Sequence, residues 1–196
     1  GTNFIDGLNG LVLSYYLTIV FIVFKLGLFE YSFLSNLDVY IIMIVLIYLI
    51  LFNLFNQLYI GDSGSYLIGF ITGFFLIQIY ENGPLFSPYF IALLLWYPAF
   101  EILFSIIRKI KFKKSPFNPD NKHLHHLLFL CINKKYKLSN NFSNNLCSLI
   151  IILYNILIFY IATFNIYYTS LHISLFIFNI VVYLALYFKL SKTYFE

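Results

Sequence analysis

Six long apolar runs are the feature that most constrains how this chain can fold. They cover roughly residues 9–24, 39–58, 66–80, 88–107, 146–165 and 171–189. The runs approach the ~20 residues that a helix needs to cross a ~30 Å hydrocarbon layer. They lack the polar–apolar alternation of barrel strands, and in lipid only helices and closed barrels satisfy their own backbone. The sequence therefore predicts an all-α polytopic transmembrane helix bundle of about six spans, as one transmembrane domain over residues 1–196.

The composition agrees with this fold class. Hydrophobic residues make up 61% of the chain and charged residues 10%, whereas soluble domains carry about 25% charged residues. We therefore expect an integral membrane protein, with no nucleic-acid partner. Cys131 and Cys147 lie in or beside a Lys-rich loop, which we place in the cytoplasm, where structural disulfides are rare. We expect two inert thiols.

The positive charges predict the orientation. Nine of the twelve Lys and Arg residues fall within residues 108–137, and Lys189 and Lys192 lie near the end of the chain. The positive-inside rule places both regions, including the C-terminus, in the cytoplasm. Counting crossings backwards from Arg108 puts residues 61–65 and then residues 3–10 on the same side. We expect these segments, and the histidines that follow Arg108, at the cytoplasmic face of the inner (plasma) membrane.

The first polar motif is Asn-Phe-Ile-Asp-Gly-Leu-Asn-Gly at residues 3–10. Asn3 and Asp6 are one helical turn apart, so they can present an amide oxygen and a carboxylate on one face. The alternative is that Asp6 is an ordinary acidic residue at a helix start beside a glycine turn.

The second motif is Gly-Asp-Ser-Gly-Ser at residues 61–65. Its glycines permit a tight turn, and Ser63 or Ser65 can cap the helix that follows. The N–H groups at that helix start can bind phosphate, and Asp62 is a hard oxygen ligand suited to Mg²⁺. The alternative is a polar turn with an N-cap, although a bare carboxylate between two spans is costly.

The third motif holds His123, His125 and His126, on a loop or a short interfacial helix. Three imidazoles can form a zinc site, but no fourth ligand or Cys pair is nearby. We favour hydrogen bonds to an anionic phosphate, assisted by Lys122. A solvated His-rich loop on anionic lipid is the remaining alternative.

Further polar residues lie within or directly beside the apolar runs. Glu101 is an acid well inside a span, which makes it a functional candidate, and Arg108 lies seven residues on. The alternative is that Glu101 is a structural partner of Arg108. Asn53, Asn56 and Gln57 in the second run are expected to form hydrogen bonds between helices.

Taken together and in this order, the motifs resemble the polyprenyl-phosphate N-acetylhexosamine-1-phosphate transferases. These membrane enzymes move a sugar phosphate from a UDP-sugar onto a lipid phosphate. The family pattern Asn-x-x-Asp-Gly-x-x-Gly is similar to residues 3–10, and Gly-Asp-x-Gly-Ser to residues 61–65, with Leu-Ile-Gly following at 67–69. The pattern Pro-Phe-x-Pro-Asp-x-x-His-x-His-His-Leu is similar to residues 116–127. The resemblance extends to about residue 128.

The resemblance implies roles for these residues. Asp62 and Asn3 would bind Mg²⁺, with Mn²⁺ as the alternative metal, and Asp6 and Asp62 would be catalytic. The three histidines, with Asn3 and Lys122, would contact the diphosphate, and the substrates would be polyprenyl phosphate and a UDP-N-acetylhexosamine.

Family members carry four or five spans before the first motif, together with an Asp-Asp pair, and this chain has no Asp-Asp pair. We therefore expect the chain to be the C-terminal part of a longer phosphosugar transferase of cell-envelope polysaccharide or peptidoglycan synthesis. One alternative is a catalytically incomplete membrane scaffold or partner subunit. A metal transporter is disfavoured, because apart from Glu101 and His172 the spans lack acids and histidines.

Overall fold

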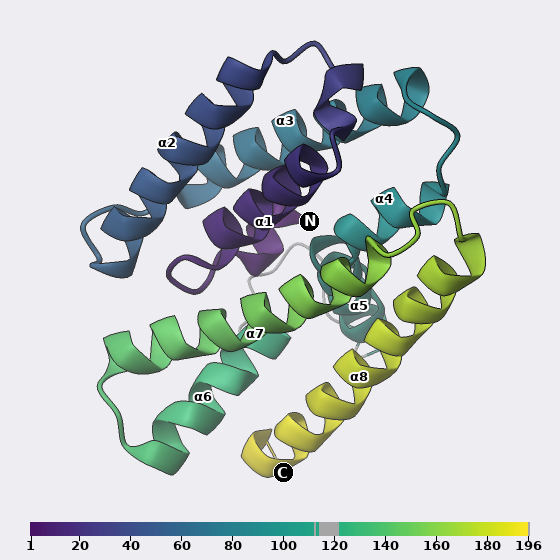
Figure 1. Cartoon of the computed structure of the whole chain (residues 1–196). Helices are drawn as coiled ribbons and strands as arrows, with labels where there is room; N and C mark the ends of the chain where they lie inside the picture. The colour runs from purple at the N-terminus through teal and green to yellow at the C-terminus, as the bar shows by residue number, and fades with distance from the viewer. Residues whose placement is uncertain (112, 114–121, 196) are drawn as a thin grey trace.

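The computed structural model describes residues 1–111, 113 and 122–195, and this part of the chain consists of helices joined by turns, without strands (Figure 1). The predicted all-α fold is confirmed. The helices, with two short 3₁₀ helices (η), are η1 (Thr2–Ile5), α1 (Leu11–Lys25), η2 (Leu28–Tyr31), α2 (Asn36–Leu54), α3 (Gly61–Asn82), α4 (Pro88–Leu94), α5 (Trp96–Lys111), α6 (Leu124–Tyr136), α7 (Asn140–Ala162) and α8 (Thr169–Phe195).

All six predicted apolar segments fold as helices, but they differ in length. Among the described residues, four helices are long and apolar enough to cross a membrane: α2, α3, α7 and α8. Helices α4 and α5 pass the same test together, although they bend by 71° at their junction. The first segment is α1, which has only 15 residues. Length and composition thus support four to five of the predicted spans.

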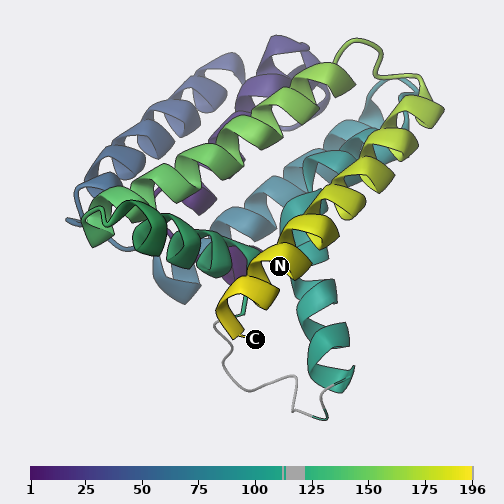
Figure 2. The same cartoon turned by 90° about the horizontal axis from the view of Figure 1, so that it is seen from below.

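The bend between α4 and α5 has a local cause. Pro98 has no N–H with which to bond the carbonyl of Leu94, four residues earlier. The hydroxyl of Tyr15, a fully buried residue of α1, donates to that carbonyl instead, at 2.8 Å. The break is therefore stabilised by a helix that packs beside it. In Figure 2 the C-terminal part of α5 projects beyond the neighbouring helices.

Helix α1 lies inside the bundle, whereas α2 and α3 present apolar surface. Helix α1 packs against α2, α3 and α7, and most of its side chains are buried. The membrane-crossing windows of α2 and α3 are only 17% and 28% buried. Their exposed apolar side chains are of the kind that transmembrane helices present to lipid.

The bundle has two distinct ends. At one end, the start of α1 meets the end of α2, where Asn9 donates to Asn56 at 2.5 Å. At the other end, Asn82 at the close of α3 donates to the Tyr31 carbonyl of η2 at 3.3 Å. Helix α3 runs between the two ends, so its first turn lies near the start of α1 (Figure 1).

The start of α3 differs from the prediction. The third apolar segment was expected to begin at residue 66, after a turn, but α3 begins at Gly61 and includes the second motif in its first turns. The predicted capping by Ser63 or Ser65 is wrong, because no side chain caps this helix. The Ser65 hydroxyl instead donates within the helix to the Asp62 carbonyl at 3.0 Å.

Candidate active site

The first motif lies against the first turns of α3. Asn3 in η1 donates from Nδ2 to the Tyr66 hydroxyl at 3.2 Å, and its Oδ1 accepts from the Ser65 hydroxyl at 3.3 Å. The approach is close, because a Cβ at Gly69 would collide with Oγ1 of Thr2. A residue without a side chain at position 69 therefore lets η1 reach α3. The first two motifs meet there.

The two acids of these motifs share one electrostatic environment. Asp6 directly follows η1 and is half-buried, whereas Asp62 lies in the first turn of α3 and is exposed. Burial raises the pKa of Asp6 above its usual value, and the negative charge of Asp62 raises this pKa further. Two carboxylates that disfavour each other's charge form a place where a divalent cation is stabilised.

The donor set fits Mg²⁺ better than zinc. The described residues contain no group of three or more His, Cys, Asp or Glu side chains that could hold a metal ion. The zinc alternative for the histidines therefore has no support. Mg²⁺ is usually held by one or two carboxylates plus substrate phosphates, and Asp62 and Asp6 are the carboxylates that would be available to it. The Asn3 oxygen, which accepts one hydrogen bond from Ser65, retains a second lone pair.

The histidines open a short helix. Helix α6 begins directly after His123, which is its N-cap residue, and His125 and His126 lie in its first turn. The rings of His125 and His126 are 4.3 Å apart, and those of His123 and His125 are 5.6 Å apart and nearly parallel. The sequence predicted either a loop or a short interfacial helix for the histidines, and the short helix is confirmed. Residues 116–121, which precede the histidines in the third motif, lie outside the described residues.

The third motif also contacts the first. A Cβ at Gly7 would lie only 2.6 Å from Nε2 of His125 and 2.9 Å from Cε1 of His126. The ring of Phe4 meets that of His123 edge-on, with 5.6 Å between centroids. Segment 1–10 thus touches the start of α3 on one side and the start of α6 on another. The predicted convergence of the three motifs at one end of the molecule is confirmed.

His125 differs from its neighbours in charge. Burial lowers the pKa of His125 well below its usual value, and the charges of His126 and His123 lower it further. Its Nδ1 has no hydrogen-bond partner among the described residues. A neutral imidazole offers one N–H, so His125 can bind phosphate through a hydrogen bond but not through charge. Any charge attraction has to come from the other cations of the site.

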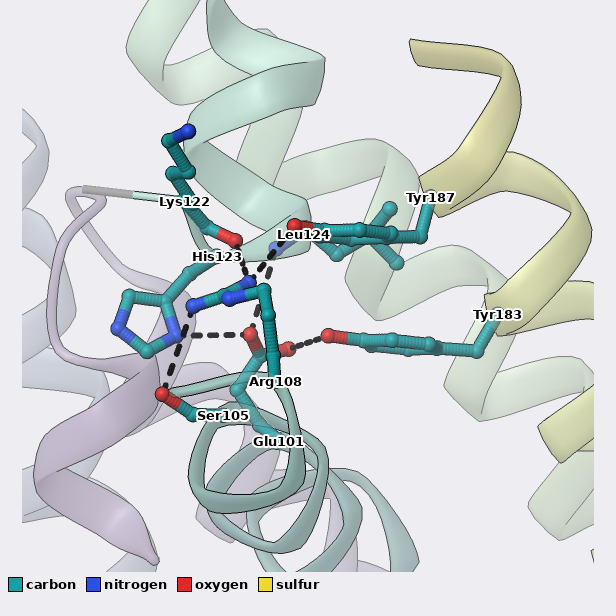
Figure 3. A network of polar contacts seen from close by, with 8 residues as sticks. All are labelled: Glu101, Ser105, Arg108, Lys122, His123, Leu124, Tyr183 and Tyr187. Atoms are coloured by element: carbon teal, nitrogen blue, oxygen red, sulfur yellow. Dashed lines mark hydrogen bonds and ion pairs between the residues drawn. The ribbon is translucent and has the colours of Figure 1, made fainter. Parts of the chain in front are cut away.

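Glu101 connects helices α5, α6 and α8 (Figure 3). It is 1% exposed, and its Oε1 lies 2.9 Å from Nδ1 of His123 and accepts from the Leu124 N–H at 3.3 Å. Its Oε2 accepts from the Tyr183 hydroxyl at 2.8 Å. Glu101 therefore holds the first residues of the histidine helix.

Arg108 supports the same segment through the backbone. It donates to the carbonyl of Lys122 and, at 2.9 Å, to the Tyr187 hydroxyl. Arg108 thus binds Lys122 and Glu101 binds the next residue of the chain, His123. The Lys122 side chain is exposed and extends away from Glu101 (Figure 3). Its role toward the diphosphate stays a prediction.

Sequence reasoning missed the two tyrosines of α8 that contact the charged residues of α5. Tyr183 and Tyr187 are four residues apart and therefore share one helix face. That spacing was visible in the sequence. What the sequence could not show is that this face meets Glu101 and Arg108.

An amide cluster, formed by Asn9, Asn53, Asn56 and Asn144, fixes the end of the first motif. The Asn53 side chain accepts from the Gly10 N–H, and the Asn56 side chain accepts from Nδ2 of Asn9. From α7, Asn144 accepts from the Asn9 N–H at 2.6 Å. Asn53 of α2 thus bonds the N-cap residue of α1, as predicted, whereas the bond of Asn56 joins the turns next to these helices.

Comparison with known proteins agrees with this geometry. Residues 1–80 match the family model of glycosyl transferase family 4. Through this segment the chain is similar to glycosyl transferase family 4. The match spans the first two motifs, which are the motifs that meet at Asn3 and Ser65.

Similar proteins carry consistent names. An undecaprenyl-phosphate alpha-N-acetylglucosaminyl 1-phosphate transferase of Thermotoga maritima is 33% identical over 78 residues, which are 40% of this chain and 25% of that protein. A probable undecaprenyl-phosphate N-acetylglucosaminyl 1-phosphate transferase of Bacillus subtilis is 36% identical over 73 residues, or 37% of this chain and 20% of that protein.

A third similar protein extends the similarity further along the chain. A decaprenyl-phosphate N-acetylglucosaminephosphotransferase of Mycolicibacterium smegmatis is 29% identical over 149 residues, covering 64% of this chain and 36% of that protein. The chain thus spans about a third or less of the length of these relatives. No solved structure matches the chain significantly.

Proposed function

We propose that the protein transfers an N-acetylhexosamine-1-phosphate from a UDP-sugar to a polyprenyl phosphate and releases UMP. The reaction would take place at the cytoplasmic face of the inner membrane, in synthesis of cell-envelope polysaccharide or peptidoglycan. The observation that carries this proposal is the convergence of the three motifs: segment 1–10 touches both the start of α3 and the histidines of α6. The names of the relatives support a polyprenyl phosphate acceptor.

The transfer is a displacement at phosphorus. An oxygen of the lipid phosphate forms a bond to the β-phosphorus of the UDP-sugar. The bond from this phosphorus to the bridging oxygen breaks, and the electron pair leaves with UMP. Little covalent chemistry falls to the protein in such reactions, so its contribution is positioning and stabilisation of charge.

The site residues divide this work between two groups. Asp62 and Asn3, with Asp6 beside them, would hold Mg²⁺, or Mn²⁺ as the alternative, which when bound neutralises charge on the diphosphate. On the other side of segment 1–10, His123, His125 and His126 would donate hydrogen bonds to the diphosphate. The exposed Lys122 adds a positive charge next to them.

Replacement of Asp62 tests the metal assignment. In the protein expressed from its complete gene, we expect Asp62→Asn to reduce UMP release at least about 100-fold, because the amide removes the exposed negative charge of the site. The measurement is UMP release from a panel of UDP-sugars with polyprenyl phosphate and Mg²⁺. The amount of variant protein in the membrane is measured alongside.

The matched control is Asp38→Asn, an exposed acid that belongs to the capping box of α2. We expect this variant to retain activity. Near-normal turnover by the Asp62 variant would overturn the metal assignment. Absence of transfer from every UDP-sugar by the unmodified protein would overturn the enzymatic function and favour the membrane scaffold.

A further inference from the structure

Glu101 is almost fully buried and contacts His123, one of the histidines of the site. It has no role of its own in the proposed transfer. We propose that Glu101 is a positioning residue for His123: it fixes the ring so that Nδ1 carries a proton and Nε2 faces the diphosphate. The importance of this orientation for catalysis rests on the proposed function, whereas the orientation itself does not.

The hydrogen-bond partners of Glu101 decide which ring nitrogen carries the proton. An ionised carboxylate only accepts hydrogen bonds. The Leu124 N–H occupies Oε1 together with Nδ1 of His123, and the Tyr183 hydroxyl occupies Oε2. A carboxylate this buried is costly unless donors satisfy it. Nδ1 of His123 is therefore the N–H donor, at 2.9 Å.

The same contact sets the direction of the ring. In Figure 3 the second ring nitrogen of His123 points away from Glu101, toward the N-terminal segment. Phe4 of that segment packs edge-on against the ring, and His125 stacks on it at an interplanar angle of 10°. The ring is thus held on its Glu101 side by a hydrogen bond and on other sides by aromatic contacts.

Helix α8 contributes to the frame around this pair, because it contacts both Glu101 and Arg108 of α5. Tyr183 binds Glu101, and Tyr187, whose ring is parallel to that of Tyr183 within 3°, binds Arg108. Arg108 in turn binds the Lys122 carbonyl, directly before His123. Both the backbone before His123 and its side chain are therefore anchored by the same two helices.

This arrangement has a chemical consequence for phosphate binding. Because Nδ1 of His123 is occupied by Glu101, Nε2 is the ring nitrogen left for the phosphate, and it offers an N–H when the ring carries both protons. An anionic diphosphate needs such a donor. Outer carboxylates that orient a histidine in this way typically contribute about 10- to 100-fold to the function of that histidine.

The ring tautomer can be measured without any activity. The chain has four histidines, so ¹⁵N-histidine NMR of the protein in lipid bilayers resolves few signals, and His123→Asn assigns the one of interest. We expect a proton on Nδ1 of His123 in the unmodified protein. In Glu101→Gln we expect a mixture of tautomers, because an amide can present either its oxygen or its NH₂ group. A neutral His123 with its proton on Nε2 alone in the unmodified protein would overturn the proposal.

A double-mutant cycle tests whether Glu101 acts through His123. We expect Glu101→Gln to lower kcat/KM for the UDP-sugar about tenfold, and Glu101→Asp, which keeps the charge, to restore part of this loss. In a His123→Asn background the same Glu101→Gln change is expected to cost less than about twofold, since coupled residues are not additive. The control is Glu81→Gln, which changes an exposed acid near the C-terminal end of α3 and is expected to leave kcat/KM unchanged.

The outcomes separate this inference from the proposed function. An equal tenfold loss in both backgrounds would show that Glu101 acts independently of His123 and would overturn the positioning role. If the unmodified protein transfers no sugar phosphate, the proposed function fails, and the NMR result alone decides the orientation of His123.

Discussion

Gly7 shows how a single residue joins two motifs. The neighbouring Gly10 adopts a positive φ of 74°, so its conformation favours glycine. Gly7 is not among the positive-φ residues. Its requirement is space, because His125 and His126 occupy the volume of a side chain at this position. From the sequence alone, both glycines belong to one turn, and only the three-dimensional contact distinguishes their roles.

We expect Gly7→Ala to lower UMP release about tenfold or more, because a Cβ 2.6 Å from Nε2 of His125 must displace the two imidazoles, and small misplacements in active sites cost up to ~10²-fold. The control is Gly73→Ala in the middle of α3, where nothing lies within 4 Å of the added Cβ. That variant should keep its activity, since Ala favours helix by up to about 1 kcal/mol over Gly. Normal turnover by the Gly7 variant would contradict the contact between the first and third motifs.

The sequence predicted those features of the helices that depend on local hydropathy. Each apolar run became a helix because a backbone in lipid must satisfy its own hydrogen bonds. The start of α3 was mispredicted because residues 61–65 are helical and do not form a separate turn, so Ser65 lies inside the helix and cannot cap its start. The contact of Tyr183 with Glu101 could not be predicted, because it depends on how α8 crosses α5.

The amide cluster provides a test of how helices fix the first motif. Asn53 accepts from the Gly10 N–H and donates to the Leu58 carbonyl at 2.7 Å. Asn53→Leu keeps the size of the side chain but removes the partner of the Gly10 N–H and of the Leu58 carbonyl. Each buried polar group left unpaired costs about 1–3 kcal/mol of stability. We expect the Tm of the purified protein, followed by the fluorescence of its single tryptophan, to fall by at least about 2–4 °C. Asn141→Ala, at an exposed position of α7, is the control, and equal Tm values for both variants would contradict the stabilising role of the cluster.

The contacts bring the motifs to one end of the bundle, and the charge pattern predicts on which side of the membrane that end lies. The meeting of the motifs at one end rests on hydrogen bonds such as that between Asn3 and Ser65. The predicted side of the membrane rests on the positive-inside rule, which counts Lys and Arg near the ends of spans. The contacts come from the structure and the orientation is predicted from the sequence. The proposed UDP-sugar donor depends on both, because UDP-sugars are found in the cytoplasm.

Cysteine labelling distinguishes the two orientations. After replacement of Cys131 and Cys147 by Ser, single cysteines are placed at Ser63, which is exposed beside Asp62, and at Leu85, which is 99% exposed in the turn between α3 and α4. We expect a membrane-impermeant maleimide to label Leu85→Cys in intact spheroplasts, and Ser63→Cys only after permeabilisation. The opposite pattern would place the motifs on the outer face, away from cytoplasmic UDP-sugars. In that case the convergence of the motifs would stand, but the donor proposed for them would not.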